Sequence, residues 1–398
     1  MNLNETPVAN RLHIGIFGKR NSGKSSLINS ITGQETALVS PVAGTTADPV
    51  YKNMEIHGIG PCVFIDTAGF DDVGEIGELR VEKTRKAVEK TDIALLIFNE
   101  AKGITLEKEW YEEFKKKNIP IIAILNKSDL IKDIEDAINL IEKNIGIKPI
   151  AVSAKDKKGI EQICAEIIHK LPEDFDAKKI TDGIVNDGDL VLLVMPQDIQ
   201  APKGRLILPQ VQTLRELLDK KCVVLSTTTD KLDEALSSLS KPPAVIITDS
   251  QVFKTVYDKK PKESKLTSFS VLFAGYKGDL DYYTQSAVAI DNLNEKSKVL
   301  IAEACTHAPL AEDIGREKIP RMLRKKAGEG LKIDIVSGAD FPADLSSYSL
   351  IIQCGACMFN RKYVLSRVEK ARNQNIPMSN YGVVIAYLSG ILDKISLK

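Results

Sequence analysis

The sequence predicts an α/β protein of three successive domains with largely parallel sheets. Residues 12–170 alternate short apolar runs with amphipathic stretches, as β-α units do. The 398 residues are 43% hydrophobic, enough for two or three cores at about 150 residues per domain. Charged stretches at 173–179 and 258–263 predict linkers. We therefore expect domains at 1–172, 181–260 and 266–398.

In the first domain, apolar runs predict strands, and helical periodicity predicts a helix after each of them. The expected strands are Leu12–Phe17, Cys62–Ile65, Ile93–Phe98, Ile121–Leu125 and Pro149–Val152. The expected helices are Lys24–Ile31, Ile76–Glu89, Leu106–Lys117, Ile134–Asn144 and Ile160–Lys170. Pro172 is a stop signal for the last helix.

The remaining two domains are expected to be α/β as well. Strands of the middle domain are expected at Leu190–Val194, Val223–Leu225 and Ala244–Ile247, with helices at Val211–Lys220 and Lys231–Leu239. Strands of the last domain are expected at Ser270–Phe273, Lys298–Ala302, Lys332–Val336 and Ser349–Ile352, before an apolar closing helix at Tyr381–Leu388.

Charge and composition argue against several classes of function. Lys and Arg number 54 and so do Asp and Glu, so the chain lacks the surplus cations from which non-specific nucleic-acid binding draws its affinity. No apolar run approaches the roughly 18 residues that span a bilayer, and the first residues do not resemble a leader peptide. Six cysteines are too sparse for a disulfide scaffold. We expect a cytoplasmic protein without membrane or nucleic-acid partners.

A phosphate-binding loop is predicted directly after the first strand. Residues 18–25 fit G-x4-G-K-S and precede an amphipathic helix, which is the context a P-loop requires. Lys24 is expected to bridge the β- and γ-phosphates, and the Ser25 hydroxyl to coordinate Mg²⁺. The expected nucleotide contacts in this loop are Gly18, Asn21, Ser22, Gly23, Lys24, Ser25 and Ser26.

Three further motifs indicate that the nucleotide is GTP or GDP. Asp66-Thr67-Ala68-Gly69 ends a strand, so that Asp66 can hold Mg²⁺ through water and the Gly69 N–H can sense the γ-phosphate. In Asn126-Lys127-Ser128-Asp129, Asp129 can accept two N–H bonds from guanine, a donor pair that adenine lacks. Ser153-Ala154-Lys155 is expected to close over the guanine carbonyl. The sequence thus predicts a P-loop GTPase, which converts GTP and water into GDP and phosphate.

The loop before Asp66 contains Gly44-Thr45-Thr46-Ala47-Asp48, and Thr46 is the natural second hydroxyl ligand of Mg²⁺. This loop and Asn21 resemble the TrmE–Era class of GTPases. That resemblance implies that Asn21 helps to bind an activating K⁺ ion, and Thr45 joins the expected nucleotide contacts. The residues expected to carry hydrolysis are Lys24, Thr46, Asp66 and Gly69.

Phe70 stands where Ras-like proteins carry the glutamine that orients the attacking water. Hydrolysis is therefore expected to be slow without K⁺ or a conformational trigger. Three acidic residues nearby are candidates for placing the water, although solvated switch residues are the simpler interpretation. They are Asp71, Asp72 and Glu75.

The cysteines fall into two groups. Cys62, Cys164 and Cys222 lie beside apolar residues and are expected to be core thiols. Cys305-Thr306-His307 and Cys354-Gly355-Ala356-Cys357 each follow an apolar strand, and carboxyl ends of neighbouring parallel strands share one edge of a sheet. If the two strands are neighbours, both motifs meet. A thiol redox pair, a Cys3His zinc site and an iron–sulfur cluster all remain possible from this spacing.

A TrmE–Era-type GTPase followed by C-x-H and C-x-x-C motifs resembles the HydF family, the GTPases that mature iron–iron hydrogenase. The similarity includes the middle stretch 195–210. It implies a dimerisation domain, a homodimer, and a last domain that binds a 4Fe–4S cluster through Cys305, Cys354 and Cys357. It also implies a scaffold that receives a transient two-iron precursor from radical-SAM maturases and delivers it to apo-hydrogenase.

One position departs from that family's pattern. Gln353 stands before the C-x-x-C motif where the family usually has His, and an amide is a poor iron ligand. The fourth iron is then left to His307, to a solvent or small ligand, or to a carboxylate such as Asp187 or Asp189. The alternative function is a ribosome- or tRNA-associated GTPase with a zinc or thiol-redox module.

Overall fold

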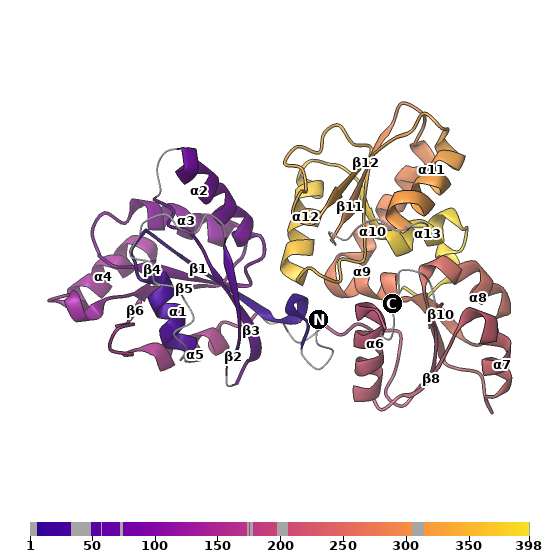
Figure 1. The fold of residues 1–398 in the computed structure, drawn as a ribbon, viewed down its shortest axis with the longest axis horizontal. Helices are drawn as coiled ribbons and strands as arrows, with labels where there is room; N and C mark the ends of the chain where they lie inside the picture. The colour runs from indigo at the N-terminus through magenta and orange to yellow at the C-terminus, as the bar shows by residue number, and fades with distance from the viewer. Residues whose placement is uncertain are drawn as a thin grey trace. The chain divides into compact units, whose positions relative to one another are not determined.

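The structure is a computed structural model that describes residues 6–32, 49–56, 58–71, 75–172, 175, 178–196, 206–304 and 314–397. The chain divides into two compact units, Met1–Ala177 and Lys178–Lys398 (Figure 1). Both are α/β, in agreement with the predicted class. Within the described ranges, no helix has the length and apolar character needed to cross a membrane.

The first unit contains a sheet in the order β2-β3-β1-β4-β5-β6, in which only β2 runs antiparallel to its neighbour. Its strands are β1 (Leu12–Gly18), β2 (Val50–Ile56), β3 (Gly60–Asp66), β4 (Ile93–Phe98), β5 (Ile121–Leu125) and β6 (Ile150–Ala151). Its helices are α1 (Lys24–Thr32), α2 (Glu75–Val88), α3 (Thr105–Lys116), α4 (Ile134–Ile145) and α5 (Ile160–His169).

Cores on both faces of this sheet explain its continuous apolar strands. Every residue of β1 is buried. Ile14 and Ile16 pack on one face with Leu27 of α1, whereas Phe17 packs on the other with Trp110. The unpredicted strand β2 has the sequence VYKNMEI and is mostly exposed, because it lies at the sheet edge and needs no apolar run.

The second unit contains two four-stranded parallel sheets, ordered β10-β9-β7-β8 and β12-β11-β13-β14. The first comprises β7 (Leu190–Val194), β8 (Val223–Thr227), β9 (Val245–Thr248) and β10 (Lys265–Ser268), with α6 (Leu208–Asp219), α7 (Leu232–Ser237) and α8 (Phe253–Lys259). The second comprises β11 (Lys298–Glu303), β12 (Lys332–Ser337), β13 (Leu350–Gln353) and β14 (Met378–Asn380). The other helices are α9 (Phe269–Lys277), α10 (Leu280–Ala287), α11 (Ile319–Ala327), α12 (Arg361–Asn373) and α13 (Tyr381–Leu388).

Short helical turns complete the described elements. They are η1 (Val8–Asn10), η2 (Ser128–Leu130), η3 (Thr229–Lys231), η4 (Ser250–Val252), η5 (Val288–Asn292), the π-helical η6 (Ile314–Lys318) and η7 (Leu392–Lys394).

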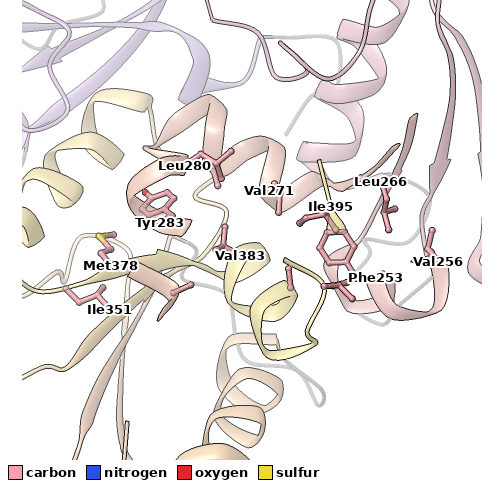
Figure 2. Packing of buried hydrophobic residues seen from close by; sticks show 14 of the residues in the cluster. Phe253, Val256, Leu266, Val271, Leu280, Tyr283, Ile351, Met378, Val383 and Ile395 are labelled. Carbon is pink, nitrogen blue, oxygen red and sulfur yellow. The ribbon is translucent and has the colours of Figure 1, made fainter. Parts of the chain in front are cut away.

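One hydrophobic core joins the two sheets of the second unit. Figure 2 shows Phe253 and Leu266 from the region of the first sheet packed in the same cluster as Ile351 and Met378 from the second. Helix α9 contacts α6 on one side and α12 and α13 on the other. Burial between these layers is what holds residues 178–398 together as one unit.

The predicted strand Ser270–Phe273 is wrong, because these residues belong to α9. Val271 and Phe273 are buried in two different cores, so the helix is apolar around most of its circumference and shows little periodicity. The helix begins where the Ser268 side chain accepts a hydrogen bond from the Val271 N–H at 3.2 Å.

Candidate functional site

The P-loop follows β1 in the conformation that its glycines predict. Asn21 (φ 58°) and Gly23 (φ 90°) both adopt left-handed backbone, and a Cβ at position 23 would lie 2.3 Å from Asn126 Nδ2. The Lys24 Nζ donates to the carbonyls of Gly18 (2.9 Å) and Lys19 (2.8 Å). The side chain of Lys24, which is expected to bind the phosphates, is therefore hydrogen-bonded to the backbone of its own loop.

Two predicted Mg²⁺ residues meet at the end of β3. The Ser25 hydroxyl donates to Asp66 Oδ2 at 2.8 Å. Burial raises the pKa of Asp66 above its usual range, while the Ser25 hydrogen bond and the positive charges of Lys24 and Lys52 oppose that rise. A divalent cation would supply a compensating positive charge beside this half-buried carboxylate, so the donor set fits Mg²⁺.

Asn126 ties the base-binding motifs to the P-loop. Its side chain is 1% exposed; Nδ2 donates to the Ser22 carbonyl at 2.9 Å, and Oδ1 accepts from the Ala154 N–H at 3.3 Å. Lys127 Nζ donates to the Asn21 carbonyl at 2.6 Å. The predicted phosphate and base loops thus form one hydrogen-bonded assembly.

Asp129, the residue predicted to recognise guanine, is part of the same assembly. Asp129 is exposed, and its Oδ1 accepts from the Ser153 hydroxyl at 2.8 Å. That hydrogen bond fixes one carboxylate oxygen and orients the group. Asn126, Lys127, Asp129, Ser153 and Ala154 are thereby brought together as expected.

Gly69 lies against the P-loop. A Cβ at this position would lie 2.7 Å from the Arg20 N and 2.8 Å from Asp71 Oδ1, and the Arg20 N–H donates to that same Asp71 oxygen at 2.6 Å. Phe70 is instead buried and stacks on Trp110, with ring centroids 5.5 Å apart. Its side chain therefore belongs to the core, and Asp71 is the acidic side chain at the P-loop.

Several predicted residues lie outside the described part of the chain. They are Thr45, Thr46, Asp48, Asp72, Cys305 and His307, together with the side chain of Glu75.

Three cysteines are core residues, as predicted. Cys62 and Cys222 are buried, and Cys164 packs against the same core as Cys62. Burial raises the pKa of all three thiols, in the case of Cys62 to about 12. These thiols are thus poor nucleophiles and poor metal ligands.

The C-x-x-C motif follows β13, and β13 is paired in parallel with β11, the strand that precedes Cys305. Cys354 Sγ accepts hydrogen bonds from the N–H groups of Ala304 (3.1 Å) and Ala356 (3.4 Å). The two strands are therefore neighbours, and the N–H of Ala304, the residue before Cys305, contacts Cys354. Among the described residues no group of three possible metal ligands occurs.

The loop geometry suits a sulfur ligand. Ala356 adopts left-handed backbone (φ 50°), and its N–H donates to Cys354 Sγ within the same tight turn. Desolvation raises the pKa of the Cys354 thiol to about 11, although both N–H groups and Arg367 lower it. A positive metal centre would remove this penalty by stabilising the thiolate.

Two buried cations near this loop were not predicted. Lys277 is 1% exposed and donates to loop carbonyls, and Arg367 is 2% exposed, with its guanidinium carbon 4.6 Å from the centre of the Phe359 ring. In the sequence, a single lysine at the end of an apolar run does not indicate that its side chain is buried. Gln353 is also buried, and its Oε1 has no hydrogen-bond partner among the described residues.

The two carboxylates proposed from the sequence as fourth iron ligands lie in the segment that leads into β7. Asp187 is exposed in the loop that leads into β7, and Asp189 Oδ2 accepts from the Asn186 N–H at 2.8 Å. Both precede the amino end of β7 in the first sheet, whereas the C-x-x-C loop follows the carboxyl end of β13 in the second.

The fold and the nucleotide loops define the first unit as a P-loop GTPase domain. Residues 13–127 match the family model of the 50S ribosome-binding GTPases. Residues 180–278 match the hydrogen maturase F dimerization domain, and residues 281–397 match the hydrogen maturase F tetramerization domain. The chain belongs to the hydrogen maturase F (HydF) family, with an N-terminal GTPase domain of the TrmE–Era type.

Individual relatives match part of the chain. It is 32% identical to the tRNA modification GTPase MnmE of Paraburkholderia xenovorans over 158 residues, covering 39% of this chain and 34% of that protein. It is 36% identical to the GTPase Der of Wolinella succinogenes over 184 residues, covering 44% and 38%. The chain thus spans little more than a third of these relatives. Aquifex aeolicus Era aligns at 20% identity with a TM-score of 0.37, covering 57% of this chain and 98% of that structure.

Proposed function

We propose that this protein is a GTP-hydrolysing scaffold of hydrogenase maturation that holds a 4Fe–4S cluster and delivers a two-iron precursor to apo iron–iron hydrogenase. The observation that carries the proposal is the contact between the Ala304 N–H and Cys354 Sγ, in a chain with two hydrogen maturase F domains. It supports a common site for Cys305, Cys354 and Cys357. The ribosome- or tRNA-associated alternative gains no support from these two domains.

In the GTPase domain, different residues have separate roles in hydrolysis. Lys24 already bonds two loop carbonyls and would exchange them for phosphate oxygens. Ser25 and Asp66 would hold Mg²⁺, which neutralises charge that develops on the phosphates. The Gly69 N–H lies beside the P-loop, where the γ-phosphate would bind. Thr46 would be the second hydroxyl ligand.

We propose that K⁺ activates GTP hydrolysis, because none of the described side chains replaces the glutamine that orients the attacking water in Ras-like proteins. Phe70 is buried against Trp110. Asn21 lies at the P-loop with left-handed backbone, and its carbonyl is fixed by Lys127. GTP hydrolysis should be faster in KCl than in NaCl at equal ionic strength, and Asn21→Ala should remove the difference.

In the last domain, Cys305, Cys354 and Cys357 would hold the cluster, which would provide an iron atom to which the two-iron precursor can be bridged. The fourth position would fall to His307 or to an exchangeable small ligand, because Gln353 is a poor ligand and its side chain is buried. An exchangeable position suits a carrier, since its cargo then displaces no thiolate.

The edge strand β8 supports dimerisation through the first sheet of the second unit. Among the described strands it pairs with β7 alone. Val223 is 64% exposed, and Leu218 of the preceding helix α6 is 55% exposed. An exposed strand edge with apolar side chains is a template for pairing with a second copy. Radical-SAM maturases and apo-hydrogenase are the proposed further partners.

The test begins with anaerobic reconstitution of the full chain with iron and sulfide. Broad absorption near ~400 nm that dithionite bleaches is expected, and a colourless protein with stoichiometric zinc would refute the proposal. Cys354→Ser and Cys357→Ser should lose this absorption, whereas Cys222→Ser should keep it. Lys24→Ala should abolish GTP hydrolysis and leave iron content unchanged. Loaded protein should restore hydrogen production when titrated into apo-hydrogenase.

A further inference from the structure

A buried lysine binds the C-x-x-C loop from a different part of the fold. Lys277 is the last residue of α9. Its Nζ donates to the carbonyl oxygens of Ala356 (3.4 Å), Cys357 (3.2 Å) and Phe359 (2.6 Å). All three donors of one ammonium group are thus used within a single short loop.

The charge of Lys277 requires an explanation beyond these hydrogen bonds. Burying an ammonium group is costly unless negative charge compensates it. The Lys277 side chain is nevertheless buried, and its Nζ lies 3.2 Å from the carbonyl oxygen of Cys357 in the C-x-x-C loop. The three carbonyl oxygens could accept hydrogen bonds equally well from a neutral donor, so they do not by themselves account for a buried positive charge. The ammonium group therefore lies where a negatively charged group bound by the two cysteines would compensate its charge.

The position of Lys277 also links two domains. It lies within residues 180–278, which match the dimerization domain, whereas the loop lies within residues 281–397, which match the tetramerization domain. Helix α9 contacts α6 of the first sheet and α12, the helix that follows the loop. A displacement of α9 would therefore move the ammonium group relative to the cysteines.

We infer that Lys277 is a positioning residue through which the dimerization domain fixes the Cys354–Cys357 loop and places one positive charge beside that loop. Fixing the loop does not depend on the proposed function. The effect of the charge on an iron cluster rests on that function.

Hydrogen exchange of the metal-free full chain tests the first part. The amides of Cys354, Ala356 and Phe359 donate to Ala302 O (3.0 Å), Cys354 Sγ (3.4 Å) and Ala356 O (3.0 Å). In Lys277→Met, which keeps most of the apolar stem, they should exchange at least about tenfold faster than in wild type, because the lost bonds involve a charged donor. Unchanged exchange at all three amides would overturn the inference.

Lys220→Met is the matched control. Lys220 is also buried in the second unit, and its Nζ donates to the Val185 carbonyl at 3.2 Å. Its replacement should leave exchange of the loop amides unchanged. Acceleration spread equally over β11 and β13 in Lys277→Met would assign the lysine a role in global stability and overturn the local one.

The reduction potential of the reconstituted cluster tests the second part. A nearby positive charge stabilises the reduced, more negative cluster, so Lys277→Met should shift the potential to a more negative value. Lys277→Arg keeps the charge and should stay near wild type. An unshifted potential in Lys277→Met would overturn the charge role. Failure of wild-type protein to take up iron would instead refute the proposed function, and the exchange result would stand independently.

Discussion

The hydrogen bonds of Asn126 predict a large effect from a small substitution. Asn126→Ala removes both bonds at once and leaves the Ser22 carbonyl and the Ala154 N–H without their partner. The side chain is 1% exposed, so water cannot easily replace it. Each unsatisfied buried group costs roughly 1–3 kcal/mol. Because Ala154 is only partly buried, the sum for the two groups falls in the lower part of the summed range, and the GTPase domain should lose about 2–4 kcal/mol of its free energy of unfolding.

Nucleotide binding should weaken in the same variant. The two bonds hold the P-loop and the Ser153-Ala154-Lys155 loop in place before the ligand arrives. If binding must restore about half of the lost energy, the affinity for GDP falls roughly tenfold, since 1.4 kcal/mol corresponds to a factor of ten.

Urea unfolding of the nucleotide-free protein and calorimetric titration with GDP measure the two effects. Asn144→Ala is the matched control, because its Nδ2 bonds the Leu140 carbonyl within the exposed face of α4, where water can replace it. A loss of stability no greater than that of the control, with unchanged GDP affinity, would refute the assignment of Asn126 as the link between the loops.

Three further predictions address other parts of the molecule. Burial raises the pKa of Asp66, so the empty folded state favours the protonated carboxyl, and stability falls as pH rises above its ordinary value of 3.8. Asp66→Asn should flatten that fall in chemical denaturation while abolishing Mg²⁺-dependent hydrolysis; a wild-type pH profile would contradict this. Val223→Lys places a charge on the exposed edge of β8 and should weaken self-association in analytical ultracentrifugation, whereas Lys241→Glu, a change of surface charge away from that strand, should not; an unaltered dimer in Val223→Lys would exclude β8. Ser268→Ala removes the cap of α9 and should cost about 1 kcal/mol in thermal unfolding, and equal stability would show that the cap is dispensable.

Coupling between GTP and the proposed metal site is best examined through partner binding. The chain divides into two compact units. A nucleotide can shift an equilibrium only by binding one state more tightly than the other. Affinity for apo-hydrogenase, measured with GDP and with a non-hydrolysable GTP analogue, therefore reports whether the GTPase domain controls delivery.

The nucleotide site was predictable because its chemistry is local. Backbone N–H groups, one lysine and one hydroxyl within residues 18–25 must follow a strand and precede a helix, and the structure places them so. The sequence left the pairing of the strands before the two cysteine motifs as a condition, and the structure shows that these strands are parallel neighbours whose carboxyl ends share one edge.

Errors arose where burial, rather than local pattern, decides the structure. Residues 270–273 form part of a helix because α9 is enclosed by two cores, and an all-apolar run has no period that distinguishes helix from strand. Strand β2 was not predicted from the sequence, because an exposed edge strand needs few apolar residues.

The sequence by itself determined the P-loop, the guanine-reading motif and the two cysteine motifs, since each depends on residue types at fixed short spacings. Only the tertiary structure decided that Asn126 links two loops, that Phe70 belongs to the core, and that Lys277 lies buried against the C-x-x-C loop. These contacts join residues far apart in the chain, and their energies come from desolvation and packing, which exist only once the layers have assembled.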